Sequence, residues 1–282
     1  MKLIGFRTPE TTAILVGSLD TDQVVPLAPL EEFWADPASA LAAESAGETI
    51  PLTDVEIVPP VLPGARVICV GLNYRAHVAE GSFRDETLPD HPTLFGRWTA
   101  SLTAGDAPAF VPNGEAGLDW EGEIAAYLGS DLADADPDTA RAAVLGYSTF
   151  NDLTARRAQK LTSQWTLGKN ADGSGPLGPL VTADEVGDLR DGLRLRTRVN
   201  GVTVQDGNTR DQIFEVGEVL SFISQTLTLR AGDILCTGTP EGVGYARTPP
   251  WLLQPGDTVE VEAERLGVLS TPILARPGGA AR

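Results

Sequence analysis

Glu121 and Glu123, in the stretch "DWEGEIA" at residues 119–125, are the first residues whose spacing could support chemistry. In an extended strand they project from the same face, about 7 Å apart. The opposite face is apolar and should be buried, which fixes the register of the strand; it carries Trp120, Gly122, Ile124, Ala126 and Leu128. Solvent, a nearby Arg or Lys, or a hard divalent cation such as Mg²⁺ or Mn²⁺ could compensate the two like charges. A cation site would require a further acidic ligand.

Asp152 is a candidate for that ligand. It follows an apolar, strand-like run in "GYSTFNDLTARRAQ", residues 146–159, where a strand end could direct a carboxylate into a cleft. The alternative is structural, because "NDLTARRAQK" could begin a helix that Asp152 caps.

His77 and Glu80 form a second candidate pair, in "CVGLNYRAHVAEG" at residues 69–81. Residues three apart are neighbours on one helical face, and a carboxylate that orients an imidazole makes the histidine a useful general base. The alternative is a surface pair of little energetic weight. The chain has only 2 histidines, His77 and His91, so a histidine base has few candidates.

Composition restricts the function classes. The 282 residues carry a formal net charge of −18 without a basic stretch, which argues against a nucleic-acid partner. An anionic small substrate would need a locally positive site. No run of 18 apolar residues occurs, and the first residues lack a signal peptide's pattern, so we expect a cytoplasmic protein that does not bind membranes. Cys69 and Cys236 lie in apolar runs and are expected to be reduced core residues.

The elements that must position these residues are mainly strands. Residues 1–63 are predicted to be a small N-terminal β-rich domain and linker, with one helical segment at residues 30–47 that ends at its glycine. Residues 64–282 are predicted to be the catalytic domain, in which short apolar runs alternate with Gly, Pro, Asp and Asn turns. Helical patterns are few there, at residues 139–145 and 213–227. The expected fold class is therefore α+β, and rich in β-strands.

Five motifs in order resemble the fumarylacetoacetate hydrolase superfamily, in its acylpyruvase or 2,4-diketo acid hydrolase branch. They are "GLNYRAHVAE", "DWEGEIA", "FNDLTARRAQ", "GKNADGSGPLGP" and "ILCTGTPEGVG", and the resemblance runs from about Val67 to Gly267. It implies a mixed β-roll with flanking helices, a homodimer, and a bound Mg²⁺ or Mn²⁺, with Ca²⁺ as an alternative.

The resemblance also assigns roles to residues. Glu121, Glu123 and Asp152 match the family's metal ligands. His77 and Glu80 match a dyad on a segment that closes over the substrate, and Lys169 matches a catalytic lysine near it. Positions that contact substrate oxygens are matched by Arg156, Gln159 and Thr239. Departures occur at Arg157, Asn170 and Ala171, where many relatives carry an acidic residue, a serine and a phenylalanine.

The activity that the resemblance implies is hydrolysis of a C–C bond in an anionic 2,4-diketo acid or acylpyruvate. His77, assisted by Glu80, would activate water, Lys169 would stabilise negative charge on oxygen, and the metal would act as a Lewis acid. The same chemistry could serve decarboxylation of oxaloacetate or isomerisation of an oxo-diacid. A non-catalytic, ligand-binding relative is the remaining alternative.

Overall fold

The structure is a computed structural model, and it describes residues 1–43, 48–80 and 90–277. The first part of the chain is a small group of strands with two short helices. Its elements are β1 (Lys2–Arg7), β2 (Leu15–Asp20), β3 (Gln23–Pro29), α1 (Leu30–Ala35), α2 (Pro37–Ala42), β4 (Ile50–Pro51) and β5 (Glu56–Val58).

The predicted single helix at residues 30–47 is wrong in one respect, because the chain forms α1 and α2 instead. Asp36 ends α1 and caps α2, where its carboxylate accepts a hydrogen bond from the Ser39 backbone N–H at 3.0 Å. Pro37 occupies the first turn of α2, a position that tolerates the missing N–H, whereas a continuous helix would not. Gly47, the predicted end of the segment, lies outside the described residues.

The remainder of the chain is a larger β-rich region. Its helices are α3 (Arg75–Glu80), α4 (Pro137–Ala142), α5 (Arg156–Gln159), α6 (Thr166–Lys169), α7 (Ala183–Val186) and α8 (Val216–Ser224). Its strands are β6 (Val67–Gly71), β7 (Thr93–Arg97), β8 (Leu102–Ala104), β9 (Ala109–Val111), β10 (Gly122–Leu128), β11 (Val144–Asn151), β12 (Gly175–Leu177), β13 (Leu180–Thr182), β14 (Arg194–Val199), β15 (Val202–Asn208), β16 (Ile234–Cys236), β17 (Thr258–Ala263) and β18 (Gly267–Ala275). The helices expected at residues 139–145 and 213–227 correspond to α4 and α8.

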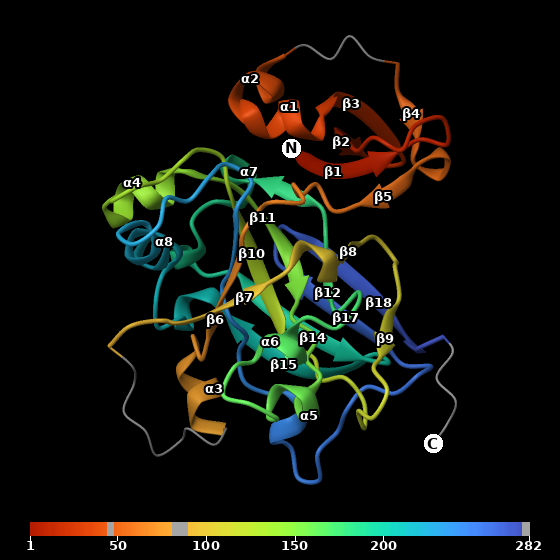
Figure 1. Cartoon of the computed structure of the whole chain (residues 1–282), viewed down its shortest axis with the longest axis vertical. Helices are drawn as coiled ribbons and strands as arrows, with labels where there is room; N and C mark the ends of the chain where they lie inside the picture. The colour runs from red at the N-terminus through yellow and green to blue at the C-terminus, as the bar shows by residue number, and fades with distance from the viewer. Residues whose placement is uncertain (44–47, 81–89, 278–282) are drawn as a thin grey trace.

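The strands form mixed sheets, which confirms the predicted fold class. The described residues make a 13-stranded sheet and a 5-stranded sheet, the latter in the order β15-β14-β17-β18-β9. Most neighbours are antiparallel, but β16 pairs with β6, β12 with β8 and β18 with β9 in parallel. The N-terminal strands join the larger sheet where β1 pairs with β13 (Figure 1). The domain boundary between residues 63 and 64 stays a prediction; residues 59–66 contain no helix or strand.

Strand β10 passes through the middle of the molecule, and every residue in it is buried. Ile124, Ala126 and Leu128 pack in a core shared with α8. Ala125 and Tyr127 pack in a second core, which includes Trp34 of α1. The sequence pattern predicted one buried face, but both faces are covered, so the glutamate face is also removed from solvent.

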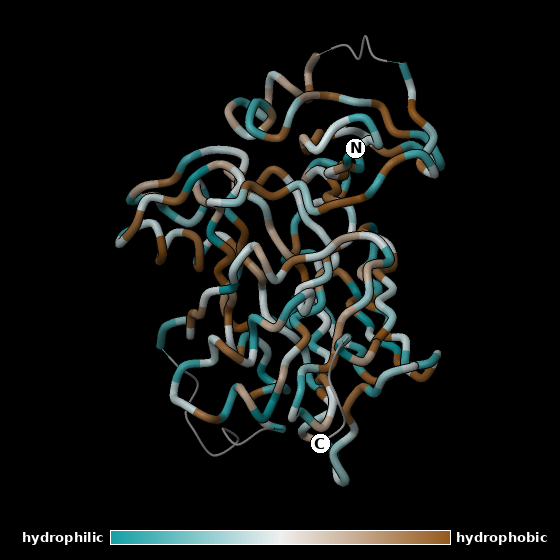
Figure 2. The backbone as a smooth tube through the Cα atoms, turned by 45° about the vertical axis from the view of Figure 1, so that its right-hand side comes forward, coloured by the Kyte–Doolittle hydropathy of each residue, from teal (hydrophilic) through white to brown (hydrophobic). Residues whose placement is uncertain are grey.

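The central strand of the 5-stranded sheet, β17, keeps a simpler pattern. In β17, buried and partly exposed residues alternate along the strand. Over the described chain as a whole, Figure 2 shows hydrophobic and hydrophilic residues interleaved over short stretches of the tube. No helix within the described residues has the length and apolar character needed to cross a membrane. Cys69 and Cys236 are buried free thiols at paired positions of β6 and β16, as expected.

Short helices α3, α5 and α6 lie in the half of the molecule away from the N-terminal strands (Figure 1). They carry His77, Glu80, Arg156, Gln159 and Lys169. Residues 81–89, which make up most of the segment predicted to close over a substrate, lie outside the described residues.

Candidate metal and substrate site

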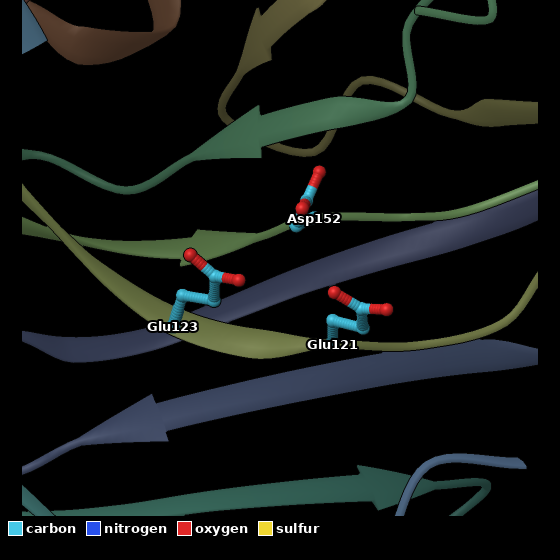
Figure 3. Close-up of side chains that lie close together, drawn as sticks. All are labelled: Glu121, Glu123 and Asp152. Carbon is cyan, nitrogen blue, oxygen red and sulfur yellow. The ribbon is translucent and has the colours of Figure 1, made fainter. Parts of the chain in front are cut away.

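The three predicted metal ligands converge. Glu121 directly precedes β10, Glu123 lies within it, and Asp152 directly follows β11. Antiparallel pairing of Gly122 with Asn151 sets the register, and the Asp152 backbone N–H donates to the Glu121 carbonyl at 2.9 Å. One carboxylate oxygen from each ligand lies within 4.8 Å of the others, and all three residues are buried. Figure 3 shows the two glutamates side by side, facing the strand end that carries Asp152. Asp152 is therefore not a helix cap; Ala155 holds the N-cap position of α5.

The chemistry of this donor set fits a hard divalent cation. All three donors are carboxylates, which Mg²⁺ and Mn²⁺ prefer. Glu123 is the least compensated, since its described hydrogen-bond partner is the Gly238 backbone N–H at 3.0 Å. Burial, reinforced by the charge of Asp152, raises the pKa of Glu123 well above its ordinary value. A cation held among the three carboxylates would favour the ionised form.

A buried lysine and a largely buried arginine surround the other two ligands. Lys169 Nζ lies 2.7 Å from Glu121 Oε2 and 2.6 Å from Asp152 Oδ2. Arg156 Nη2 lies 2.6 Å from Glu121 Oε1. Burial alone would raise the pKa of Glu121, but the charges of Lys169 and Arg156 outweigh it and lower that pKa to about 2. Burial disfavours the charge on Lys169, whereas Asp152 and Glu121 raise its pKa, so Glu121 and Lys169 are ionised at neutral pH.

Arg97 is a functional candidate that the sequence reasoning missed. Its Nε lies 2.6 Å from Asp152 Oδ1, and its other nitrogens donate to the Ser101 hydroxyl, the Leu153 carbonyl and Ser174. An arginine with only 3% of its surface exposed must have its donors satisfied by such partners. The available signal was a charged residue at the end of the apolar strand "TLFGR".

Asp119 was also missed, although it belongs to the first motif. It is fully buried and accepts hydrogen bonds from Arg156 Nε at 2.7 Å, from the Gly244 N–H at 2.6 Å and from the Tyr245 N–H at 3.1 Å. Burial raises the pKa of Asp119 despite the opposing charge of Arg156. Asp119 therefore connects the arginine beside Glu121 to the loop that follows β16.

The predicted dyad is present. His77 Nδ1 lies 2.9 Å from Glu80 Oε1, and the Gly242 backbone N–H donates to the Glu80 carboxylate at 2.8 Å. An ionised carboxylate only accepts hydrogen bonds, so Nδ1 carries the proton in this pair and Nε2 of a neutral His77 is free to accept one. Gly242 has a φ of 99°, and a Cβ there would lie 2.2 Å from the Val204 carbonyl oxygen. The glycine-rich "TGTPEGVG" segment therefore positions the dyad, in addition to turning the chain.

A cavity of about 660 Å³ brings the parts together. Eight of the nine predicted site residues line it. The ninth, Asp152, does not line it but contacts Lys169, which does. The eight are His77, Glu80, Glu121, Glu123, Arg156, Gln159, Lys169 and Thr239. Val70, Phe95, Trp165 and Tyr245 contribute apolar and aromatic wall. The cavity is large enough for a small organic acid.

All three residues predicted to contact substrate oxygens already hydrogen-bond to the protein, Arg156 through its bond to Asp119. Gln159 accepts from Arg156 Nη1 at 3.0 Å. The Thr239 hydroxyl donates to the Gly122 carbonyl at 2.8 Å and accepts from Gln205, which also accepts from the Gly122 N–H. Gln205 is a further buried residue that the sequence reasoning missed. The substrate-binding roles of Arg156, Gln159 and Thr239 stay predictions.

Comparison with known proteins indicates the same family as the five sequence motifs. Residues 66–274 match the family described as fumarylacetoacetate (FAA) hydrolase C-terminal. The chain is 32% identical to the mitochondrial oxaloacetate tautomerase fahd2 of Xenopus laevis, over 97% of this chain and 90% of that protein. It is 37% identical to the oxaloacetate tautomerase YisK of Bacillus subtilis, over 79% of this chain and 74% of that protein.

Solved structures are similar across the whole fold. The fumarylacetoacetate hydrolase of Exiguobacterium antarcticum superposes with a TM-score of 0.82 at 33% identity, covering 98% of this chain and 100% of that one. The 5-carboxymethyl-2-hydroxymuconate delta-isomerase of Mycobacterium smegmatis superposes with a TM-score of 0.80 at 29% identity, with the same coverage. Since the family match spans residues 66–274 and a relative of 32% identity aligns with 97% of the chain, this protein is a member of the fumarylacetoacetate hydrolase family.

Proposed function

We propose that this enzyme is a divalent-metal-dependent tautomerase of oxaloacetate or a closely related oxo-diacid. The observation that carries the proposal is that a proton-transfer pair, His77 and Glu80, lines the same cavity as Glu121 and Glu123, two of the three carboxylates suited to a cation. The relatives named oxaloacetate tautomerase favour this reaction over C–C hydrolysis, which the motifs suggested first.

The chain's own residues suit such a reaction. Glu121, Glu123 and Asp152 would hold Mg²⁺ or Mn²⁺, and the cation would supply a Lewis acid that polarises the oxo group of the substrate. Tautomerisation moves one proton between carbon 3 and the oxygen on carbon 2, and it requires no water. His77 Nε2 would accept the proton from carbon 3 as the C–H bond breaks, and the imidazolium, stabilised by Glu80 through Nδ1, would return that proton to the oxygen on carbon 2; the reverse transfer gives ketonisation.

The charge balance supports an anionic substrate. Asp119, Glu121, Glu123 and Asp152 are four carboxylates, and the three cationic side chains in contact with them are Arg97, Arg156 and Lys169. If all are ionised, one negative charge remains. A dication would give the cluster a net positive charge. An anionic substrate needs such a locally positive site, because the chain as a whole carries a charge of −18.

Hydrolysis of an acylpyruvate or another 2,4-diketo acid is the second candidate. It is favoured by the structural similarity to the fumarylacetoacetate hydrolase of Exiguobacterium antarcticum. In that reaction His77 would activate a water molecule and Lys169 would stabilise negative charge on oxygen. A homodimer is proposed as well, on the family resemblance alone, and light scattering would test it.

The proposal is tested by following the ultraviolet absorbance of the oxaloacetate enol after it is added to protein stripped of metal by a chelator. We expect rapid ketonisation only after Mg²⁺ or Mn²⁺ is restored, above the rate given by the same metal without protein. Mass analysis should show oxaloacetate unchanged in composition.

Release of pyruvate from oxaloacetate without faster tautomerisation would indicate a decarboxylase. Cleavage of acylpyruvates or diketo sugar acids alone would indicate a hydrolase. Metal-dependent binding without turnover of any of these substrates would identify a non-catalytic relative. Each of these three results would overturn the tautomerase proposal.

A further inference from the structure

Helix α5 presents Arg156 to the cavity, and Lys160, which directly follows the helix, presents a second cationic side chain. Arg156, Gln159 and Lys160 line the cavity, whereas Arg157 and Ala158 between them do not. Residues three and four apart share one helical face, so Lys160 lies one turn beyond Arg156, a rise of about 6 Å. The face therefore carries an inner and an outer positive charge.

The inner cations are already engaged by protein carboxylates. Arg156 contacts Asp119 and Glu121, and Lys169 contacts Glu121 and Asp152. Lys160 differs, because no ion pair to a carboxylate is present for it within residues 1–43, 48–80 and 90–277. Its Nζ lies 3.6 Å from the centroid of the Tyr245 ring, which also lines the cavity. A cation over an aromatic face keeps its charge available to a further anionic partner.

The position of this pair is held by buried contacts. The Tyr245 N–H donates to Asp119, and Asp119 also binds Arg156 at the start of α5. One buried carboxylate thus fixes both the loop that carries Tyr245 and the helix that leads to Lys160. The outer cation consequently has a defined place relative to the carboxylates at the inner end.

We infer that Lys160, held over Tyr245, recognises the distal carboxylate of a dicarboxylate substrate whose oxo-acid end lies at the inner site. This inference rests on the proposed function and narrows it, since an acylpyruvate with an uncharged distal group has no use for the outer cation. Lys160 is a specificity residue in this assignment and takes no part in proton transfer.

Binding of two unreactive acids tests the inference without catalysis. Malate and 2-hydroxybutanoate differ in their distal group, a carboxylate in the first and a methyl group in the second, and neither has an oxo group to tautomerise. Calorimetry with the Mg²⁺-loaded protein should show tighter binding of malate. Lys160→Met, which keeps the length of the side chain, should weaken malate binding roughly 3- to 10-fold because the charge is partly exposed. Binding of 2-hydroxybutanoate should change less than twofold, by the same reasoning.

The matched controls separate a local contact from a change in total charge. Lys160→Arg keeps the cation and should retain most of the preference for malate. Arg157→Met removes one positive charge from the exposed side of the same helix and should leave both affinities unchanged. Equal weakening of the two acids in Lys160→Met, or an unchanged ratio between them, would overturn the inference.

The outcome is independent of the tautomerase assay. A loss of malate preference in Lys160→Met supports the inference even if the protein does not accelerate tautomerisation. Conversely, an active tautomerase whose malate preference does not depend on Lys160 would retain the proposed function and exclude the role of this lysine.

Discussion

The cavity has two walls that differ in how they hold charge. The inner wall, at β10 and the end of β11, carries buried carboxylates whose positions follow from strand register, and it is compensated by Arg97, Arg156 and Lys169. The outer wall, at α3 and the loop after β16, holds Glu80 through the Gly242 backbone N–H, and Glu80 in turn holds His77. We conclude that substitutions in the inner wall should affect stability and metal affinity, whereas those in the outer wall should affect proton transfer with little effect on folding.

The largest effect is expected for His77→Ala in the outer wall. Loss of the general base should lower kcat by roughly 10²- to 10⁴-fold, while substrate affinity and thermal stability change little. Steady-state kinetics and thermal unfolding of the same preparation measure the two effects. His91→Ala is the control, since it removes the other histidine, which stacks on Phe222.

Glu80→Gln should also lower kcat, but less than His77→Ala does, because the shape of the side chain is kept while its charge is lost. If His77→Ala retained full turnover, proton transfer by the dyad would have to be abandoned, and a decarboxylation driven by the cation would become the better explanation.

Lys169→Met should give the largest loss of stability. Removing one partner of a buried ion pair leaves uncompensated charge, here on Glu121 and Asp152, and typically costs about 3–5 kcal/mol. Urea unfolding of the metal-free protein measures this loss, and Mg²⁺ should stabilise the variant more than the parent because it replaces the missing positive charge.

Arg194→Met is the matched control for Lys169→Met. It breaks an exposed ion pair with Asp206, so its effect should stay below about 1 kcal/mol. If the two variants lost the same unfolding free energy, the buried ion pairs of the inner wall would contribute no more to stability than an exposed pair does.

Glu123→Gln should weaken Mn²⁺ binding by roughly 100-fold, because the site loses an anionic ligand with little change in volume. Calorimetry on the folded variant measures the affinity. Glu260→Gln on β17 removes the same charge from the other sheet and should leave Mn²⁺ binding unaltered. Unchanged Mn²⁺ affinity in Glu123→Gln would show that Glu123 is not a ligand.

Among the substitutions within the site, Asp119→Asn is expected to have the smallest effect. An amide cannot accept all the hydrogen bonds from Arg156, Gly244 and Tyr245, so we expect a loss of about 1–3 kcal/mol in unfolding free energy. Because Arg156 and the Tyr245 loop would lose their shared anchor, KM should rise more than kcat falls. A KM and a stability equal to those of the parent would show that the arginine and the loop are held by other contacts.

Much of the site could be predicted because its signals are local. The alternation of a strand places Glu121 and Glu123 on one face, the spacing of three places Glu80 beside His77, and the order of five motifs indicates the family. Local signals also indicated α4 and α8, although Val144 and Leu145 of the first helical pattern belong to β11. The pattern did not predict the break at Asp36 between α1 and α2. Pro37 is compatible with the first turn of a helix, so its presence did not show whether one helix or two would form.

The sequence by itself therefore determined the glutamate pair, the pairing of His77 with Glu80 and the β-rich class, since each depends on residues a few positions apart, whereas Asp152 was predicted as a ligand through the family resemblance. Only the tertiary structure decided that the glutamate face of β10 is buried, that Arg97 from β7 compensates Asp152, and that Asp119 anchors Arg156 to the loop at Tyr245. These contacts join segments 37 to 126 residues apart. The strand order and parallel pairings that bring such segments together follow from packing of the whole sheet, which no local pattern specifies.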